Sequence, residues 1–203
     1  LVLEHGNIGT QLINWPREHV VKCLVFSHPE DEACLRLEQE NMVREVYQAC
    51  CESGHELLLE VILPADMVRS DQLYLRAVQR FYNLGIKPDW WKLPPLGRTA
   101  WQALEQLVSE RDPHCRGVVL LGLDAPEAEL ATGFAEAAHC SLVKGFAVGR
   151  SLFGAPARAW LSGDICDEHL VGQIKDNYLR LIALWRQRTM QRSSERDING
   201  VSV

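Results

Sequence analysis

The stretch Pro88-Asp89-Trp90-Trp91-Lys92-Leu93-Pro94-Pro95 is a short apolar run that carries one lysine and stops at two prolines. A short apolar run bounded by turn residues is typical of a buried strand. A lysine near the end of such a strand holds its amine in apolar surroundings, and burial or a nearby cation favours the neutral form of an amine. Because the neutral amine forms a Schiff base with a carbonyl, Lys92 is the first candidate for a catalytic residue.

Two further apolar runs also carry a charged residue in their interior. Lys22 lies within residues 19–26, and Glu60 lies within residues 56–63. Side chains of one parity share a face of a strand, so charged residues on neighbouring strands can converge. An ion-pair network that only stabilises the fold would give the same pattern. One charge on each of three successive apolar strands nevertheless favours a functional site.

Apolar runs and amphipathic stretches alternate along most of the chain. The runs are nearly continuous, as in parallel strands covered on both faces, and indicate strands at 19–26, 56–63, 88–93, 117–123 and 141–148. The amphipathic stretches indicate helices at 31–53, 70–84, 99–110, 126–138 and 167–190. A short helical turn is expected after Arg150, and the polar tail at 191–203 is expected to fray.

Residue types also mark the helix ends and the buried helix faces. Ser70 is a candidate N-cap, whereas Gly54 and Gly85 are candidate helix stops. The first two helices are expected to bury apolar stripes made of Leu35, Met42, Val46 and Ala49 in the first helix and of Leu73, Ala77 and Phe81 in the second.

Repeated β-α units predict a parallel sheet with right-handed crossovers, and therefore an α/β protein. A doubly wound sheet and a (β/α)8 TIM-type barrel both fit this pattern. Residues 26–29 (Phe-Ser-His-Pro) follow the first strand where a nucleotide-binding sheet would place glycines. Charged residues on several strands favour the barrel, in which the chemistry gathers at one mouth.

Five β-α units are visible, so residues 1–190 are expected to form the last five units of a truncated barrel domain, followed by the tail at 191–203. Five parallel strands cannot close an eight-stranded barrel, and the outer strands would expose unpaired edges. We therefore expect the chain by itself to be inactive, and either to associate through those edges or to retain upstream segments as a separate piece.

Composition limits the class of protein and its partners. The 203 residues are 47% apolar and carry a net charge of −6, which argues against nucleic acid or an anionic membrane as the main partner. The longest apolar runs are too short to span a bilayer, and the start lacks the pattern of a secretory signal.

Seven cysteines without a Cys-x-x-Cys pair indicate reduced thiols, mostly buried, in a cytoplasmic protein. No metal-ligand motif is present, and no cofactor is expected.

A second candidate site lies near the last two strands. Residues 144–150 (KGFAVGR) carry Gly145, and Gly149 directly before Arg150, while Gly122 lies in residues 119–124, which would supply the loop after the preceding strand. Glycines let backbone N–H groups approach a ligand, while arginine offers a fork for phosphate. Barrels commonly bind phosphate on the loops after their last two strands. The alternative is an ordinary strand that ends in glycine beside a surface arginine.

Four segments together resemble a known family. They are residues 15–24, 88–95, 111–117 (RDPHCRG) and 144–150. The resemblance is to the C-terminal domain of bacterial bifunctional proteins of inositol catabolism, in which a 5-dehydro-2-deoxygluconokinase is fused to a 5-dehydro-2-deoxyphosphogluconate aldolase. It covers about residues 10–190. That domain is more distantly similar to class I tagatose-bisphosphate aldolases, which are metal-free barrels.

The resemblance to the aldolases implies a role for individual residues. Lys92 matches the Schiff-base lysine, Glu60 a glutamate on the preceding strand and Lys22 a second lysine one strand earlier. Gly149 and Arg150 match the residues that hold phosphate. Two features depart from the aldolases: the acidic residue of their first strand has no counterpart here, and Pro94 stands where they place a carboxylate.

The implied reaction is cleavage of 2-deoxy-5-keto-gluconate 6-phosphate, a phosphorylated keto sugar acid, to dihydroxyacetone phosphate and malonate semialdehyde. The resemblance also implies a fused or associated sugar kinase domain, and we expect a homo-oligomer. The alternative function is a non-catalytic sugar-phosphate-binding module that serves a kinase domain. Such a module would keep Arg150 and would need no reactive lysine. A metal-dependent lyase is disfavoured because no ligand cluster is visible in the sequence.

Overall fold

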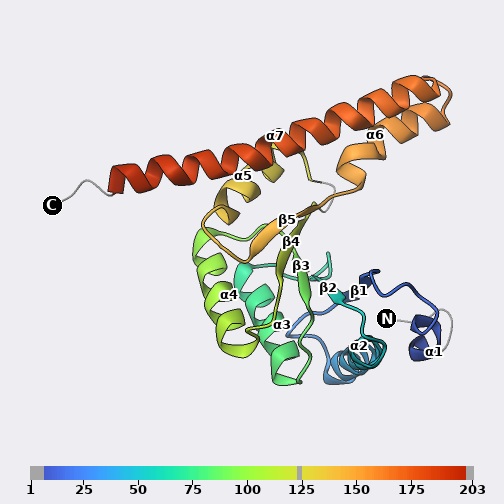
Figure 1. Ribbon diagram of the computed structural model, residues 1–203, viewed down its shortest axis with the longest axis vertical. Helices are drawn as coiled ribbons and strands as arrows, with labels where there is room; N and C mark the ends of the chain where they lie inside the picture. The colour runs from blue at the N-terminus through green and yellow to red at the C-terminus, as the bar shows by residue number, and fades with distance from the viewer. Residues whose placement is uncertain (1–6, 123–124, 200–203) are drawn as a thin grey trace. The chain divides into compact units, whose positions relative to one another are not determined.

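The structure is a computed structural model that describes residues 7–122 and 125–199, with side chains described as far as Arg188. Its elements in chain order are α1 (Ile8–Leu12), β1 (Val21–Phe26), α2 (Ala33–Ser53), β2 (Leu57–Ile62), α3 (Asp71–Asn83), β3 (Trp90–Leu93), α4 (Arg98–Arg111), β4 (Gly117–Leu121), α5 (Glu127–Ala137), β5 (Val143–Ala147), α6 (Arg150–Leu161) and α7 (Asp167–Asn199). A helix follows every one of these strands, which the colours of Figure 1 let the reader trace. The predicted alternation of an α/β protein is confirmed.

The described strands form one sheet in the order β1-β2-β3-β4-β5. β1 pairs with β2, and β2 with β3, both in parallel. The register places Glu60 between Leu24 and Lys92, and it places Leu58 between Lys22 and Trp90. Because side chains alternate between the two faces of a strand, Lys22, Glu60 and Lys92 share one face of the sheet.

The backbone falls into two compact units. The first contains Leu1–Leu93 and Gln102–Val119, and the second contains Pro94–Trp101 and Leu120–Val203. The core of the first unit forms on the face opposite the three charged residues, where the strand residues Cys23, Val25, Leu59, Val61, Trp91 and Leu93 are all buried. Trp91 is fully buried, and its indole N–H donates to the Tyr82 hydroxyl at 2.8 Å. The ring is therefore packed in the core, and its one polar group has a hydrogen-bond partner.

The helix ends of the first unit follow the sequence signals. Gly54 caps α2 in the left-handed conformation at φ 73°, with its N–H bonded to the Cys50 carbonyl. Ser70 caps α3, and its side chain accepts from the Leu73 N–H at 3.4 Å. Gly85 has φ 77° and follows the end of α3. A residue with a Cβ is strained at these positive φ values, which explains both glycines.

The predicted apolar stripes are correct for α3 and partly wrong for α2. Leu73, Ala77 and Phe81 are all buried, whereas Leu35 is exposed near the start of α2. Val43 is fully buried instead. The helical period alone did not reveal where along α2 burial begins, and the buried residues of this helix start at Glu40.

The second unit contains α5, α6 and α7 and has an aromatic core. Ring centroids of Phe134 and Phe146 lie 5.1 Å apart, and Trp185 lies 5.2 Å from Phe134 and 5.6 Å from Phe146. A Cβ at Gly133 would come within 2.5 Å of Pro95, so α5 approaches the Pro94-Pro95 turn closely. This glycine is therefore required by packing rather than by a turn.

Both C-terminal helices are longer than the sequence predicted. α6 has 12 residues where a short turn was expected, and α7 continues to Asn199, beyond residue 191 where the tail was expected to begin. No glycine or proline interrupts residues 173–199, and the arginine, glutamine and glutamate side chains there favour helix. Residues 200–203 of the predicted tail, and Leu123 of the predicted fourth strand, lie outside the described residues.

All seven cysteines are free thiols, but fewer are buried than expected. Cys23, Cys50 and Cys140 are buried, Cys115 is intermediate, and Cys34, Cys51 and Cys166 are exposed. Burial raises the pKa of Cys23 to about 11 and that of Cys50 to about 12. Buried thiols of this kind stay neutral and react poorly, because the thiolate is the reactive form.

A thiol count with Ellman's reagent at about pH 8 should separate these classes. We expect the three exposed thiols to react within minutes in the folded protein, and all seven to react after unfolding in denaturant. Rapid reaction of Cys23 or Cys50, identified by mass spectrometry of the labelled peptides, would contradict the described packing of β1 against α2.

Across the described ranges, none of the helices combines the length and the apolar character that crossing a bilayer demands.

Candidate active site

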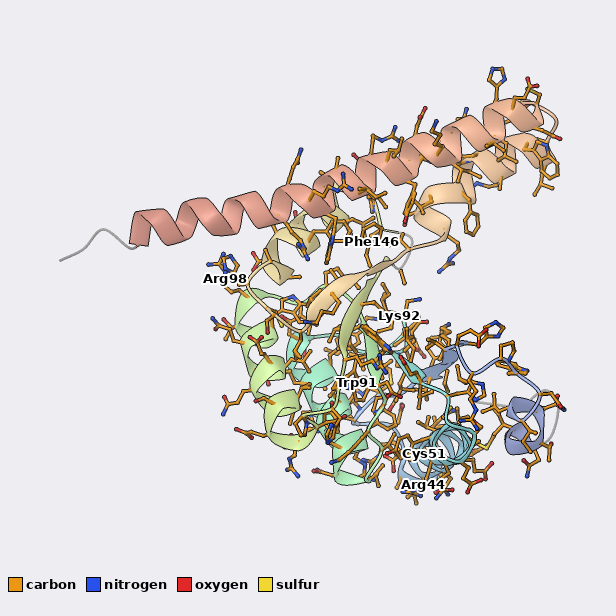
Figure 2. All side chains as sticks on the ribbon, in the orientation of Figure 1. Arg44, Cys51, Trp91, Lys92, Arg98 and Phe146 are labelled. Carbon is orange, nitrogen blue, oxygen red and sulfur yellow. The ribbon has the colours of Figure 1, made fainter. Side chains whose placement is uncertain are left out.

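The three charged strand residues meet at one carboxylate oxygen in the first unit. The Lys22 ammonium lies 2.7 Å from Glu60 Oε2, and the Lys92 ammonium lies 3.2 Å from the same oxygen. We call this group the Lys22–Glu60–Lys92 cluster. Figure 2 labels Lys92 beside Trp91 on β3, where the two neighbours belong to opposite faces of the strand. The structure thus brings together the three residues that the sequence singled out, although their catalytic roles stay predictions.

The members of the cluster differ in exposure. The Glu60 side chain is 7% exposed and that of Lys92 16%, whereas Lys22 is 47% exposed. A carboxylate buried this deeply is costly to desolvate unless it is paired, and here it has two cationic partners. Lys92 and Glu60 are therefore recessed, and Lys22 extends from the edge of the group toward solvent.

This geometry permits amine chemistry. An ammonium must lose a proton before it attacks a carbonyl, and Glu60 Oε2 lies within hydrogen-bond distance of Lys92 to accept that proton. Lys22 adds a second positive charge that can attract and orient the oxygens of an anionic substrate. An ion-pair network without catalytic function would show the same distances, so an experiment must separate the two interpretations.

The sequence did not reveal what surrounds the cluster. Phe26 has the parity of Lys22 and is 54% exposed, so the C-terminal end of β1 presents an aromatic side chain on the same face. Nearer the start of the strands, the Trp90 indole donates to Glu56 at 2.7 Å, and Arg116 pairs with Glu56 at 2.8 Å. Glu56, which directly precedes β2, is therefore bound to neighbours outside the cluster.

The predicted phosphate residues lie in the second unit, where two loops run side by side. A Cβ at Gly122 would come within 2.8 Å of Val148, and the Ser151 hydroxyl donates to the Ala125 carbonyl at 3.3 Å. Gly122 is therefore explained by the close approach of the loop that follows β5. Asp124, which the predicted loop included, lies outside the described residues.

The other predicted phosphate residues differ in their surroundings. Gly149 is the N-cap residue of α6, and Arg150 is its exposed first residue. Gly145 lies inside β5, and no described atom outside its immediate neighbours would come within 4 Å of a Cβ there. The structure gives no reason for a glycine at this position. Gly122, Gly149 and Arg150 lie in the same pair of loops, and Gly145 does not.

Arg150 lines a cavity of about 220 Å³ among α5, α6 and α7. Arg158 and Arg180 also line it, and among the described residues of the lining the only carboxylate is that of Glu127, which pairs with Arg180 at 3.2 Å. An excess of guanidinium groups over carboxylates suits an anion, because arginine binds phosphate and carboxylate groups through paired N–H donors.

Within residues 7–122 and 125–199, no group of three or more His, Cys, Asp or Glu side chains is placed to hold a metal ion.

Comparison with known proteins identifies a family. Residues 1–189 match the family model described as "Uncharacterized protein conserved in bacteria (DUF2090)". No curated protein matches the sequence. Among solved structures, the chain resembles a fructose-bisphosphate aldolase from Plasmodium falciparum with a TM-score of 0.46 and 13% identity, over 84% of this chain and 54% of that one. The chain spans about half the length of that protein, and a likeness this weak carries no functional argument.

Proposed function

The chain belongs to the DUF2090 family of bacterial proteins, and from the geometry of the Lys22–Glu60–Lys92 cluster we propose that it is a class I, Schiff-base aldolase. The observation that carries the proposal is the recessed Lys92 ammonium, 3.2 Å from a buried carboxylate oxygen that a second lysine also contacts. Schiff-base catalysis uses an amine, a group that moves protons and a positive charge near the substrate oxygens. All three stand on one face of the sheet.

The proposed substrate is 2-deoxy-5-keto-gluconate 6-phosphate, which the sequence resemblance suggests. Lys92, after giving a proton to Glu60, adds to the ketone and forms a carbinolamine. Glu60 returns the proton to the departing hydroxyl, and water leaves as the iminium forms. The carbon–carbon bond then breaks as the substrate hydroxyl gives its proton to Glu60 and becomes an aldehyde, and the iminium takes up the electron pair to become an enamine. Protonation of the enamine and hydrolysis release dihydroxyacetone phosphate, while the other product is malonate semialdehyde.

The wider setting is also part of the proposal. We place the enzyme in cytoplasmic myo-inositol breakdown, with a sugar kinase domain as fused or associated partner and with homo-oligomeric assembly. The five consecutive β-α units fit a (β/α)8 barrel. The second candidate function is a non-catalytic sugar-phosphate-binding module, and the arginine-lined cavity at Arg150 is the observation that favours it.

Borohydride trapping tests the aldolase proposal directly. The protein, together with any upstream segments that it retains, is incubated with dihydroxyacetone phosphate, the imine is reduced, and the digested protein is analysed by mass spectrometry. We expect the mass of the reduced triose phosphate on the peptide that contains Lys92. If dihydroxyacetone phosphate binds but no adduct forms, the binding module is the better description. An adduct on another lysine would show that Lys92 is not the nucleophile.

Arg150→Ala tests the phosphate role. Loss of charge-assisted hydrogen bonds should weaken the binding of phosphorylated ligands by about 10- to 100-fold. Binding of the unphosphorylated analogues should be unchanged, because Arg150 is expected to contact only the phosphate. Calorimetric titration measures both ligand classes, with the exposed Arg111→Ala on α4 as the control. Equal weakening of both classes would argue for a general structural role of Arg150.

A further inference from the structure

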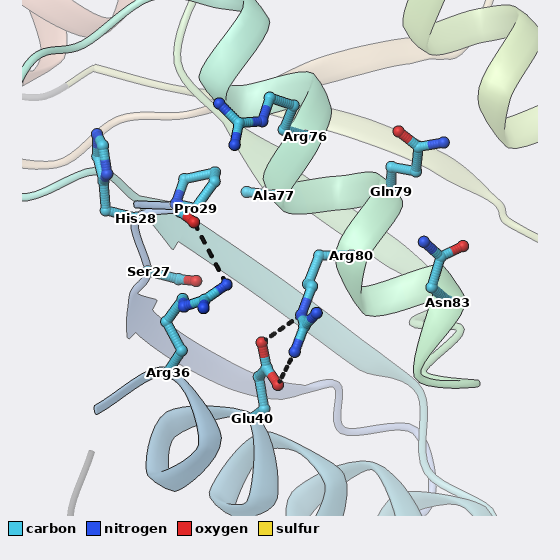
Figure 3. A pocket seen from close by; sticks show the side chains of 10 residues that line it. All are labelled: Ser27, His28, Pro29, Arg36, Glu40, Arg76, Ala77, Gln79, Arg80 and Asn83. Atoms are coloured by element: carbon cyan, nitrogen blue, oxygen red, sulfur yellow. Dashed lines mark hydrogen bonds and ion pairs between the residues drawn. The ribbon is translucent and has the colours of Figure 1, made fainter. Parts of the chain in front are cut away.

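A second arginine-lined cavity, of about 220 Å³, lies in the first unit between α2 and α3. Figure 3 shows three guanidinium groups around it, from Arg36 on α2 and from Arg76 and Arg80 on α3. The Ser27 side chain and the Gln79 and Asn83 amides also line it. The cavity combines a concentration of positive charge with neutral hydrogen-bond donors, in a chain whose net charge is −6.

Two of the arginines have carboxylate partners. Arg80 donates to both oxygens of the buried Glu40, at 2.6 and 2.9 Å, and this pair is drawn in Figure 3. The two-pronged contact fixes the Arg80 guanidinium against the wall. Arg76 pairs with Glu30 at 2.9 Å, but both side chains are at least half exposed. An exposed pair of this kind is weak, so Arg76 can turn to a ligand at little cost.

Arg36 retains an unused donor. Its Nη1 donates to the Pro29 carbonyl at a long 3.4 Å, whereas its Nε is shielded from solvent and has no hydrogen-bond partner within the described part of the chain. Shielded polar groups without a partner are rare in folded proteins and call for an explanation. A bound acceptor in the cavity would provide one.

We propose that this cavity binds a phosphate group, either as inorganic phosphate or as part of a small phosphate ester. Arg80 is bound to the buried Glu40 and Arg76 to the exposed Glu30, whereas the described partner of Arg36 is a backbone carbonyl. The remaining positive charge needs an anion with several acceptor oxygens, and phosphate offers these to arginine forks, amides and a hydroxyl at once.

The cavity is separate from the Lys22–Glu60–Lys92 cluster, although Ser27 directly follows the strand that carries Lys22. Ser27 continues the alternate positions of the buried Cys23 and Val25, whose side chains face the helices. Lys22 stands at the other set of positions, whose side chains point to the opposite face. The two sites therefore lie on opposite faces of the sheet. The proposal does not depend on the aldolase function.

Calorimetric titration with inorganic phosphate and with glycerol phosphate, in buffer free of other polyanions, tests the proposal. The measurements use Arg150→Ala protein, so that the cavity of the second unit does not contribute. We expect one phosphate per chain to bind, and Arg36→Gln to weaken that binding about tenfold or more. The matched control is Arg44→Gln, because Arg44 lies on the same helix outside the cavity and donates to Asn41 at 2.9 Å.

Arg76→Gln provides a second variant, since its half-exposed side chain can change without disturbing the core. We expect it to weaken phosphate binding while the melting temperature stays within a few degrees of the parent. Absence of phosphate binding in the Arg150→Ala protein would overturn the proposal. Equal affinities of the Arg36→Gln, Arg76→Gln and Arg44→Gln proteins would overturn it as well. Tighter binding of citrate than of either phosphate ligand would reject phosphate as the ligand class.

Discussion

Lys92→Met should lower the rate of aldol cleavage by roughly a thousandfold or more, because the residue that forms the covalent intermediate is lost. Methionine keeps the length and the apolar stem of lysine, so the β3 side chain still fits its place beside Glu60. Glu60 also keeps Lys22 as a cationic partner at 2.7 Å. The melting temperature should therefore change by only a few degrees. Steady-state kinetics, corrected for the folded fraction by circular dichroism, measure the effect.

Two controls give this result its meaning. Lys87→Met removes an exposed lysine five residues earlier, and it should leave both turnover and borohydride trapping unchanged. Lys22→Met should reduce turnover but leave trapping at Lys92 detectable, because Lys22 is expected to orient the substrate without bonding to it. If Lys92→Met instead unfolds the protein while turnover per folded molecule stays near normal, the cluster is a structural ion-pair network.

Much of the fold was predictable because its elements have strong local signals. The continuous apolar runs identified all five strands, although the flanking residues are not part of the strands: β1 begins at Val21 rather than at His19. Local sequence missed what depends on tertiary packing. The exposure of Leu35 depends on which part of α2 is covered, and a helical period does not show this. The full length of α7 could have been predicted, because no glycine or proline interrupts residues 173–199.

The cluster was partly predictable for the same reason. Side chains alternate between the two faces of a strand, so Lys22, Glu60 and Lys92 can be placed on one face once the register is known. That both lysines contact the same Glu60 oxygen depends on side-chain rotamers. The arginine cavity of the first unit was missed, although a signal existed. Arg76 and Arg80 stand one turn apart on α3, and two like charges at this spacing destabilise an isolated helix. Such a pair indicates an opposing carboxylate or a ligand, and Glu40 supplies the carboxylate for Arg80.

Glu60→Gln should lower kcat and kcat/KM together, by about a hundredfold to ten-thousandfold, because it removes the group that moves protons during formation and breakdown of the carbinolamine. Glutamine keeps the shape of the side chain and one carbonyl acceptor. It leaves the Lys22 and Lys92 ammonium groups without the carboxylate that both contact. Substrate binding should be less affected than turnover, because Glu60 is proposed to move protons rather than to bind the phosphate of the substrate.

Glu56→Gln is the matched control, because Glu56 directly precedes the same strand and pairs with Arg116 rather than with the cluster lysines. It should leave kcat unchanged and cost at most about 1 kcal/mol of stability, as is usual for partly exposed ion pairs. Steady-state rates, melting temperatures and the rate of borohydride-trapped adduct formation should be measured for both variants. If Glu60 is catalytic, the Glu60→Gln protein should form the adduct slowly and still melt within a few degrees of the parent protein. A large fall in melting temperature with near-normal turnover per folded molecule would instead assign Glu60 to the stability of the sheet.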